Sequence, residues 1–178
     1  MVVKFIEKYL QAAKDASAQN GIHYLAILTQ AAHESAYGKY AFGNNFFGVK
    51  PGKNWQGKKQ LLRTTEYSIN PNLQFPEILS KTLVERKGKK LWEYKIRDYF
   101  RAYDSAAEGF LDHGNFLTTN KRYATAMLHK DNPEKFFLEV AKAGYATDPR
   151  YAEKLIEIYK TIKTEVNEDP AIKSTSIL

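Results

Sequence analysis

The chain has 178 residues, 43% of them hydrophobic and 26% charged, which is the length and balance of one globular domain with a substantial core. The absence of cysteine excludes disulfides, a cysteine nucleophile and cysteine-based zinc sites. The net charge of +7 at pH 7 suggests an anionic partner, such as nucleic acid, a lipid surface or an acidic polymer.

Two helices are expected at the start of the chain. Apolar residues recur at helical spacing over residues 2–13, and Asn20-Gly21 is a typical helix stop. A second helix over roughly residues 22–36 is apolar on most sides, which indicates that it is buried. Glu34 lies at its C-terminal end, where the helix dipole disfavours a negative charge. Either this glutamate faces solvent, or the fold holds it in a dry cleft because its proton is used.

The pattern changes between Gly38 and about Tyr103. Frequent glycines mark tight turns, and two stretches alternate between polar and apolar residues as half-exposed strands do. These stretches are LLRTTEY at 61–67 and LWEYKIRDY at 91–99. The segment RKGKK at 86–90 is expected to form the hairpin turn that leads into the second strand.

A small β-lobe is therefore expected at about residues 50–103, with a loop at 70–77, where NPNLQFPE contains two prolines. Between Lys81 and Arg101 the sequence has eight basic residues against three acidic ones. A solvated basic face is the simplest interpretation of this excess, and a weak attraction to acidic polymers is a second one.

Helices are expected again after the lobe. Three start signals are found, namely the capping box Ser105-Ala-Ala-Glu108, Asn132-Pro133 and Asp148-Pro149. The helix after Asn132 is expected to end at Gly144, and the last helix at about Thr164. The prediction is a mainly α (α+β) single domain over residues 1–165, followed by a loose C-terminal tail at 166–178.

A metal site is not expected. The pair His33-Glu34 could begin the zinc motif HExxH, but Tyr37 occupies the position of its second histidine. The other histidines, at 23, 113 and 129, lack ligand spacing. The basic, aromatic stretch at 91–103 could stack on nucleic acid, but it has no RNA-recognition signature, so no nucleic acid is expected as a partner.

The remaining candidate chemistry is a pair of carboxylates, Glu34 and Glu66. Hydrolysis of a glycosidic bond needs one carboxyl that donates its proton to the leaving oxygen. It also needs a second group, in different surroundings, that activates water or stabilises the developing positive charge. Composition alone does not favour this interpretation, because most glutamates are surface residues.

Six short sequence motifs follow one another in the order typical of one family. They are AAHESAYGKYAFGNNFFGVK (31–50), NWQG (54–57), TTEY (64–67), YDSAAEGFLDH (103–113), RYATAM (122–127) and AGYATDPRYAEKL (143–155). With these motifs the chain resembles glycoside hydrolase family 73, the glucosaminidase domain of flagellar-type muramidase-like enzymes and bacterial autolysins. The resemblance covers about residues 22–162 and implies a lysozyme-like fold, in which a helical body and a β-lobe flank a glycan groove.

The resemblance also implies roles for three residues. The general acid would be Glu34, and Glu66 of TTEY matches the second acidic residue, which is proposed as a base or electrostatic partner. Tyr145 of GYATDP would line the site and assist, by orienting either the acetamido group of the substrate or a water. His33 stands where the family typically has an apolar residue and is expected to face away from Glu34.

Five residues would bind the substrate according to the same resemblance. Asn45, Phe47 and Gly48 match the turn that shapes the groove floor, and Trp55 matches the aromatic residue that commonly follows it. Tyr37 replaces the usual tryptophan and keeps an aromatic wall. The resemblance implies no cofactor and no metal.

The function predicted from the sequence is that of a peptidoglycan hydrolase, an endo-β-N-acetylglucosaminidase that cleaves the β-1,4 bond between N-acetylglucosamine and N-acetylmuramic acid. The mechanism stays open between retaining, inverting and substrate-assisted chemistry. The alternative is a non-catalytic glycan-binding module on the same scaffold.

The predicted partners are the glycan strands of peptidoglycan, and the predicted state is a monomer. We expect no membrane insertion, because no apolar run is long enough. The start of the chain, MVVKFIEKYLQAAKDA, does not resemble a signal peptide. The predicted place of action is the bacterial cell wall, and a phage lysin, an injected effector and a trimmed secreted protein all fit the sequence.

Overall fold

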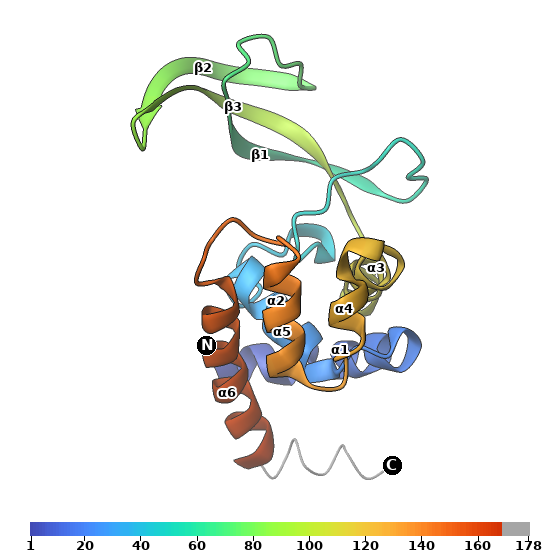
Figure 1. Cartoon of the computed structure of the whole chain (residues 1–178). Coiled ribbons are helices and arrows are strands. Elements are labelled where there is room, and N and C mark those ends of the chain that lie inside the picture. Colours follow the sequence, from blue (N-terminus) through green and yellow to red (C-terminus); the bar gives the residue numbers. More distant parts are fainter. Residues whose placement is uncertain (169–178) are drawn as a thin grey trace. The chain divides into compact units, whose positions relative to one another are not determined.

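The computed structural model describes residues 1–168, and these form two compact units (Figure 1). The helical unit comprises Met1–Phe47 and the chain from Tyr103 onward, and the sheet unit comprises Gly48–Ala102. The mainly helical α+β fold with a small sheet, predicted from the sequence, is confirmed. Of the predicted tail at 166–178, the first three residues belong to the last helix, and the rest lie outside the described residues.

The described part of the helical unit consists of α-helices and two single 3-10 turns. In chain order these are α1 (Val2–Asn20), α2 (Tyr24–Ser35), η1 (Phe42–Asn44), α3 (Ala106–Thr119), η2 (Lys121–Tyr123), α4 (Ala124–Met127), α5 (Pro133–Lys142) and α6 (Tyr151–Glu168).

Side-chain caps are present at the starts of α3 and α5, two positions where the sequence predicts them. The Ser105 hydroxyl accepts a hydrogen bond from the Glu108 N–H at 3.2 Å, and the Asn132 side chain accepts one from the Lys135 N–H at 3.2 Å. The return bond of the predicted capping box is displaced, because the Glu108 carboxylate accepts from the N–H of Asp104, at 3.0 Å. The caps predicted at both positions are therefore present, the first in a modified form.

The last helix is longer than predicted. Helix α6 begins at Tyr151, after a turn in which the Asp148 carboxylate accepts a hydrogen bond from the Arg150 N–H at 2.9 Å. It continues past the predicted end at Thr164 to Glu168, because Val166 is still buried and extends the apolar face of the helix.

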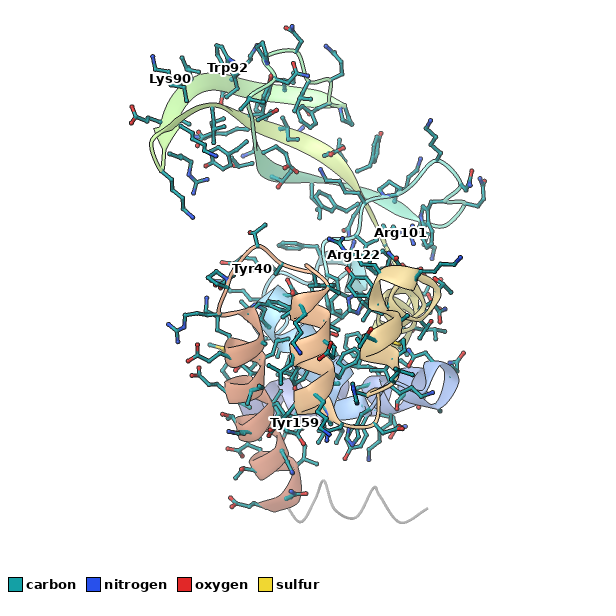
Figure 2. The ribbon with its side chains drawn as sticks, viewed as in Figure 1. Tyr40, Lys90, Trp92, Arg101, Arg122 and Tyr159 are labelled. Carbon is teal, nitrogen blue, oxygen red and sulfur yellow. The ribbon has the colours of Figure 1, made fainter. Side chains whose placement is uncertain are left out.

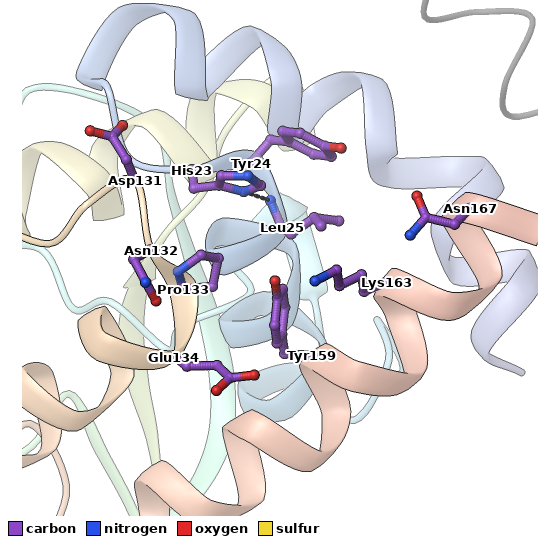
Figure 3. Close-up of a pocket in the computed structure, with 10 residues that line it drawn as sticks. All are labelled: His23, Tyr24, Leu25, Asp131, Asn132, Pro133, Glu134, Tyr159, Lys163 and Asn167. Atoms are coloured by element: carbon purple, nitrogen blue, oxygen red, sulfur yellow. Dashed lines mark hydrogen bonds between the residues drawn. The ribbon is translucent and has the colours of Figure 1, made fainter.

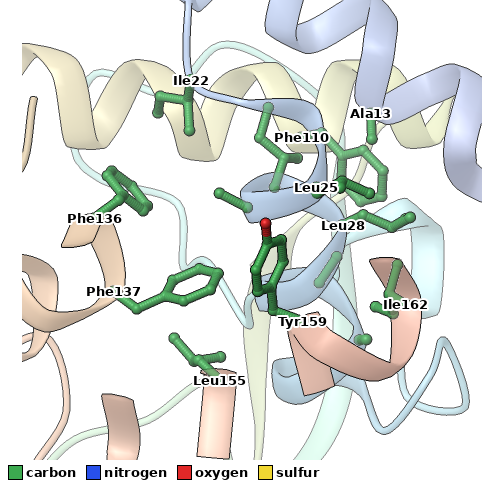
Figure 4. Packing of buried hydrophobic residues seen from close by; sticks show 14 of the residues in the cluster. Ala13, Ile22, Leu25, Leu28, Phe110, Phe136, Phe137, Leu155, Tyr159 and Ile162 are labelled. Atoms are coloured by element: carbon green, nitrogen blue, oxygen red, sulfur yellow. The ribbon is translucent and has the colours of Figure 1, made fainter. Parts of the chain in front are cut away.

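Helix α2 is the centre of the hydrophobic core. It contacts α1, α3, α5 and α6, and Figure 4 shows Leu25 and Leu28 among side chains from these helices, including Phe110, Phe137 and Ile162. This packing explains why α2 is apolar on most sides, as a helix surrounded by other helices must be. The buried core residues of the two N-terminal helices are Phe5, Ile6, Leu10, Ala13, Ala16, Leu25, Ala26, Ile27, Leu28, Ala31 and Ala32.

The sheet unit is a three-stranded antiparallel sheet in the order β1-β3-β2. Its strands are β1 (Lys59–Ser68), β2 (Glu77–Arg86) and β3 (Lys89–Arg101). The predicted hairpin turn is present at Lys87 and Gly88, whose φ values of 50° and 72° suit a tight two-residue connection. Figure 2 shows Lys90 and Trp92 near this hairpin and Arg101 at the opposite end of β3.

Strand β2 was not foreseen from the sequence. Most of its side chains are exposed on both faces, so the strand has no alternation of apolar and polar residues by which it could be recognised. A register shift between Ile78 and Ser80 interrupts its pairing with β3. Among the residues of the three strands, only Tyr94 and Ile96 are buried.

Gly109 of α3 is a position where only glycine fits. A Cβ atom added there would lie 2.3 Å from the backbone oxygen of Asn44 in η1, a separation that real Cβ atoms essentially never show. The absence of a side chain at Gly109 therefore lets α3 approach the turn that precedes Asn45 and Phe47.

We predict that Gly109→Ala lowers the free energy of unfolding by about 1–3 kcal/mol, because the overpacked backbone contact outweighs the higher helix propensity of alanine. Urea denaturation measures the effect. Gly52→Ala is the control, since a Cβ at Gly52 would meet no atom within 4 Å. Equal stability of the two variants would contradict the assigned packing.

Candidate functional site

Glu34 lies in the last turn of α2, and its carboxylate is held by a tyrosine from another helix. The Tyr151 hydroxyl, in the first turn of α6, donates a hydrogen bond to Glu34 Oε1 at 3.0 Å. The same hydroxyl accepts a hydrogen bond from Gln30 Nε2, one turn earlier in α2, at 3.3 Å. Two consecutive hydrogen bonds, from Gln30 to Tyr151 and from Tyr151 to Glu34, therefore orient the carboxylate.

The exposure of Glu34 differs from that of its neighbours in α2. Its neighbours Ala31, Ala32 and Ser35 are buried, whereas Glu34 itself is exposed. Of the two alternatives that the sequence left open for Glu34, the structure shows the exposed side chain. The reason is geometric, because the helix ends at this point and Glu34 points away from the core that surrounds the preceding turns.

The backbone directly after Glu34 is strained. Ala36 and Tyr37 both have left-handed φ values, of 49° and 56°, and Gly38 follows with a φ of 82°. Non-glycine residues rarely adopt this conformation, and such strain is found preferentially at functional sites. The Ser35 hydroxyl stabilises the turn by donating to the Ala31 oxygen at 2.6 Å and accepting from the Gly38 N–H at 2.8 Å.

Tyr145 joins the same cluster through two contacts. Its ring stacks on that of Tyr151, with centroids 5.4 Å apart and an interplanar angle of 25°. Its hydroxyl forms a hydrogen bond of 2.8 Å with Nε2 of His113 in α3. The two tyrosines and His113 thus connect the segments that precede and begin α6 with α3 and with Glu34.

Burial keeps the three aromatic members of this cluster uncharged. It lowers the pKa of His113 to about 3, so the imidazole is neutral. Burial also raises the pKa of Tyr145 and that of Tyr151, and the nearby Glu34 carboxylate raises both further. The neutral Tyr151 hydroxyl therefore serves as a hydrogen-bond donor to Glu34.

Phe47 extends the cluster, and two further predicted residues, Asn45 and Tyr37, also belong to the helical unit. The Phe47 ring stacks on the His113 ring, with centroids 3.7 Å apart and an interplanar angle of 8°. Asn45, two residues earlier, is 5% exposed and therefore positions the turn rather than presenting a free amide. Tyr37 packs edge-on against Phe5, with centroids 5.7 Å apart, and is only half-buried.

The sheet unit carries the other predicted carboxylate. Glu66 in β1 forms an ion pair with Lys50, whose Nζ lies 2.8 Å from Oε1 of Glu66 and 2.8 Å from Oδ2 of Asp98 in β3. Partial burial works against the charged ammonium, but the hydrogen bonds to Asp98 and Glu66 outweigh it and raise the pKa of Lys50. One ammonium therefore bridges two carboxylates on the same sheet.

Trp55 and Gly48 also belong to the sheet unit. The Trp55 indole donates to the Lys58 oxygen at 3.0 Å, and the Arg101 guanidinium lies over its ring, 4.2 Å from the centroid. Gly48 has a φ of 62°, and an added Cβ there would meet no atom within 4 Å. Glycine is therefore favoured by the left-handed backbone at this position, and not by a lack of room for a side chain. Of the predicted residues, Glu34, Tyr145 and Phe47 thus come together in one cluster, and Glu66 and Trp55 have local partners in the sheet unit.

Three members of the cluster were missed or misplaced by sequence reasoning. Tyr151 and His113 occur in the family motifs AGYATDPRYAEKL and YDSAAEGFLDH, but no role was assigned to them. The third member is His33, which was expected to face away from Glu34 and whose ring packs edge-on against the ring of Tyr151, with centroids 5.4 Å apart. Only the packing of α6 and α3 on α2 identifies these neighbours.

A polar hollow of about 480 Å³ lies elsewhere on the helical unit, where α2 and α5 begin (Figure 3). His23 caps α2 there by accepting a hydrogen bond from the Leu25 N–H at 3.1 Å, and burial lowers the pKa of His23. The hollow contains none of the predicted site residues, since Glu34 is at the other end of α2.

Within residues 1–168, no group of three or more histidine, aspartate and glutamate side chains is placed to hold a metal ion. No helix in the described part of the chain has both the length and the apolar character that a membrane span requires.

Comparison with known proteins identifies the family. Residues 10–164 match the family model Glucosaminidase, described as mannosyl-glycoprotein endo-beta-N-acetylglucosaminidase. The chain therefore belongs to the glucosaminidase family, and the resemblance to glycoside hydrolase family 73 seen in the sequence is confirmed.

Two curated relatives illustrate the similarity. The chain is 33% identical over 168 residues to peptidoglycan hydrolase FlgJ of Pseudomonas aeruginosa, covering 90% of this chain and 37% of the relative. It is 28% identical over 166 residues to exo-glucosaminidase LytG of Bacillus subtilis, covering 87% of this chain and 51% of the relative. The chain thus spans between about a third and a half of the length of these relatives.

Solved structures agree with this assignment. The glycoside hydrolase domain of Salmonella typhimurium FlgJ is 27% identical, with a TM-score of 0.72 and coverage of 99% of this chain and 98% of that one. The catalytic domain of the autolysin Auto from Listeria monocytogenes, at 22% identity, shares the fold with a TM-score of 0.67 over 93% of this chain and 86% of that one.

We predict a pH-dependent stability that originates in His113. Its pKa is about 3 in the folded protein and about 6.5 in an unfolded chain. As the pH falls below about 6.5 the unfolded state therefore binds the proton first, and this histidine removes about 1.4 kcal/mol of stability per pH unit down to about pH 3. In His113→Gln that contribution disappears. The free energy of unfolding, measured by urea denaturation between pH 4 and 7.5, should therefore fall less steeply towards acid pH in this variant than in the wild type.

Tyr145→Phe is the matched control for this measurement, because it removes the same 2.8 Å hydrogen bond but keeps the buried imidazole. The free energy of unfolding of Tyr145→Phe should fall towards acid pH as steeply as that of the wild type. Parallel curves for the wild type and His113→Gln would contradict the assignment of a neutral His113.

Proposed function

We propose that the chain is a glycoside hydrolase that degrades peptidoglycan by cleaving the β-1,4 bond between N-acetylglucosamine and N-acetylmuramic acid. The observation that supports this most is the carboxylate of Glu34, which is oriented by the Tyr151 hydroxyl at the exposed end of a buried helix. Membership of the glucosaminidase family supports the reaction class, and the names of the relatives FlgJ and LytG support the substrate.

Glu34 is proposed as the general acid that protonates the departing oxygen. An exposed carboxyl suits this role only when the substrate covers it, so the bound glycan is expected to exclude water from Glu34. The neutral donor Tyr151 fixes one carboxyl oxygen and leaves the other for the substrate. The left-handed backbone at Ala36 and Tyr37 ends the helical path of the chain shortly after Glu34.

The second group is proposed to be either Glu66, acting through a water, or the N-acetyl oxygen of the substrate, positioned with the help of Tyr145. The ion pair with Lys50 holds one carboxylate oxygen of Glu66 in place, and the other oxygen would contact the water. A carboxyl separation of about 5–5.5 Å in a substrate complex would indicate a retaining nucleophile, and about 6.5–9.5 Å an inverting water.

The proposed binding residues are those expected from the family. Tyr37, Asn45, Phe47, Gly48 and Trp55 would line the glycan groove, with Asn45 and Phe47 shaping its floor. We propose that the chain acts as a monomer on glycan strands at the bacterial cell wall and needs no cofactor. A glycan-binding module without catalysis is the second candidate, because the same aromatic residues would serve either role.

Glu34→Gln separates the two candidates. For an enzyme we predict a loss of about 10²–10⁴-fold in the release of fragments from purified sacculi, with binding to the sacculi retained, because only the proton donor is removed. Glu7→Gln, at an exposed position of α1, is the control and should keep wild-type activity. Mass spectrometry of the wild-type products should find N-acetylglucosamine at the reducing ends, and N-acetylmuramic acid there would refute the proposed bond.

Tyr151→Phe tests the orientation of the acid. The variant keeps the ring stack with Tyr145 but removes the hydrogen bond to Glu34, so we predict a fall in kcat of about 10- to 100-fold with little change in KM. Tyr24→Phe, in the first turn of the same α2 helix, should leave kcat unchanged. A Tyr151→Phe variant as active as the wild type would show that the hydroxyl does not orient the acid.

A further inference from the structure

The net positive charge of the protein comes from the sheet unit. Gly48–Ala102 contains thirteen lysines and arginines against five acidic residues, a net charge of +8. The rest of the chain contains fourteen against fifteen, a net charge of −1. A unit of this size with such a charge has a strong positive potential, which attracts polyanions and is screened by salt.

Within the sheet, the strand register places most of this charge on one face. Residues directly opposite each other on paired strands share a face, and the pairs include Lys59 with Arg101, and Arg63 with Arg97. We call this the cationic face, and its basic residues are Lys59, Arg63, Arg86, Lys89, Lys95, Arg97 and Arg101. The acidic residues on it are Glu77 and Glu93.

The opposite face of the sheet has a different character. It carries Glu66 and Asp98 with their shared partner Lys50, together with the buried side chains of Tyr94 and Ile96. Since that face provides both the small apolar core and the candidate catalytic carboxylate, the charges of the cationic face are not required by either.

The cationic face contains like-charge pairs that reduce the stability of the sheet. Like charges directly opposite each other on neighbouring strands repel, and Arg63 faces Arg97 in this way. Arg97 is compensated by Glu77 at 2.9 Å, whereas within residues 1–168 the Arg63 guanidinium forms no ion pair or hydrogen bond. An external anion between the strands would relieve this repulsion.

A hollow suited to such an anion lies beside Arg63. It has a volume of about 270 Å³ and is located where the register shift between Ile78 and Ser80 interrupts the pairing with β3. Its polar lining residues are Arg63, Thr64, Thr65, Ser80 and Lys95, and the apolar residues Leu79 and Ile96 complete the lining. A guanidinium, an ammonium and hydroxyl groups are the donors that a phosphate group prefers.

Two tyrosines extend the cationic face on either side of the hollow along β1 and β3. Tyr67 and Tyr99 are 39% and 42% exposed, and they have cations over their rings, with Arg86 at 4.1 Å from Tyr67 and Lys59 at 5.3 Å from Tyr99. Alternating flat rings and cations are suited to a polymer in which polyol or sugar units alternate with phosphates.

We propose that the cationic face binds a phosphodiester-linked polyol polymer of the cell wall, with one phosphate in the hollow between Arg63 and Lys95. The inference rests on the proposed function for the location of this polymer in the wall, and it assigns to the sheet unit a second contact with the wall, separate from the glycan. The complex is electrostatic, so it weakens as the salt concentration rises.

The test measures binding of the chain to isolated poly(glycerol phosphate) by calorimetry at 50 and 150 mM salt. It is repeated by co-sedimentation with cell walls that carry the polymer and with the same walls after hydrofluoric acid has removed it. We expect binding to the polymer and to intact walls, at least tenfold weaker binding to stripped walls, and weaker binding at the higher salt concentration.

Arg63→Gln with Lys95→Gln should weaken binding to the polymer by at least about tenfold, because two charge-assisted contacts are lost. Lys87→Gln with Lys90→Gln is the matched control, since it removes the same charge from the hairpin of the same unit and should change binding less than threefold. Arg63→Gln alone should weaken binding and, by removing the repulsion with Arg97, should not lower the unfolding temperature. Equal losses in the two double variants would overturn the site between Arg63 and Lys95.

Activity provides a readout that distinguishes this inference from the proposed function. The Arg63 and Lys95 double variant should hydrolyse stripped walls as fast as the wild type. Binding of the polymer without any glycan hydrolysis would refute the proposed function alone, and hydrolysis with equal binding to intact and stripped walls would refute the inference alone. Tighter binding at 150 mM salt to duplex DNA or to phosphatidylglycerol vesicles than to the polymer would also overturn it.

Discussion

The burial of α2 is the constraint on which the rest of the helical unit depends. Nine of its twelve residues are buried, and helices α1, α3, α5 and α6 pack around it. A close-packed interior does not allow such a helix to slide or rotate, so its exposed end is held rigidly. Glu34 is at that end, and its position follows from packing that takes place one to three turns earlier.

The packing of α6 against α2 also supplies the partner of Glu34. Tyr151 is in the first turn of α6, so the contact that buries its ring brings its hydroxyl to the carboxylate. The partner is a neutral donor, which orients a carboxyl without placing a cation beside it. Glu66 in the sheet unit has the opposite surroundings, because it shares an ammonium with Asp98. The two carboxylates proposed as the catalytic pair therefore differ in their local partners.

The sheet unit is organised by its surface rather than by its core. Only Tyr94 and Ile96 of its strands are buried, so hydrogen bonds, cation–aromatic contacts and ion pairs must provide much of its local order. A sheet with so small a core gains nothing for its own stability from a face of opposed arginines. The concentration of positive charge there is therefore better explained by binding than by folding.

The sequence by itself determined the five longer helices, the caps at Ser105 and Asn132, the hairpin at Lys87-Gly88 and the family, because local hydrophobic period, turn chemistry and ordered motifs are carried by neighbouring residues. It did not reveal β2, whose exposed side chains leave no period, or the exposure of Glu34, which depends on where the surrounding helices stop. Only the tertiary structure brought Tyr151 and His113 to the site and placed the cations on one face of the sheet, since contacts between residues distant in the chain follow from the packing of helices and the register of strands.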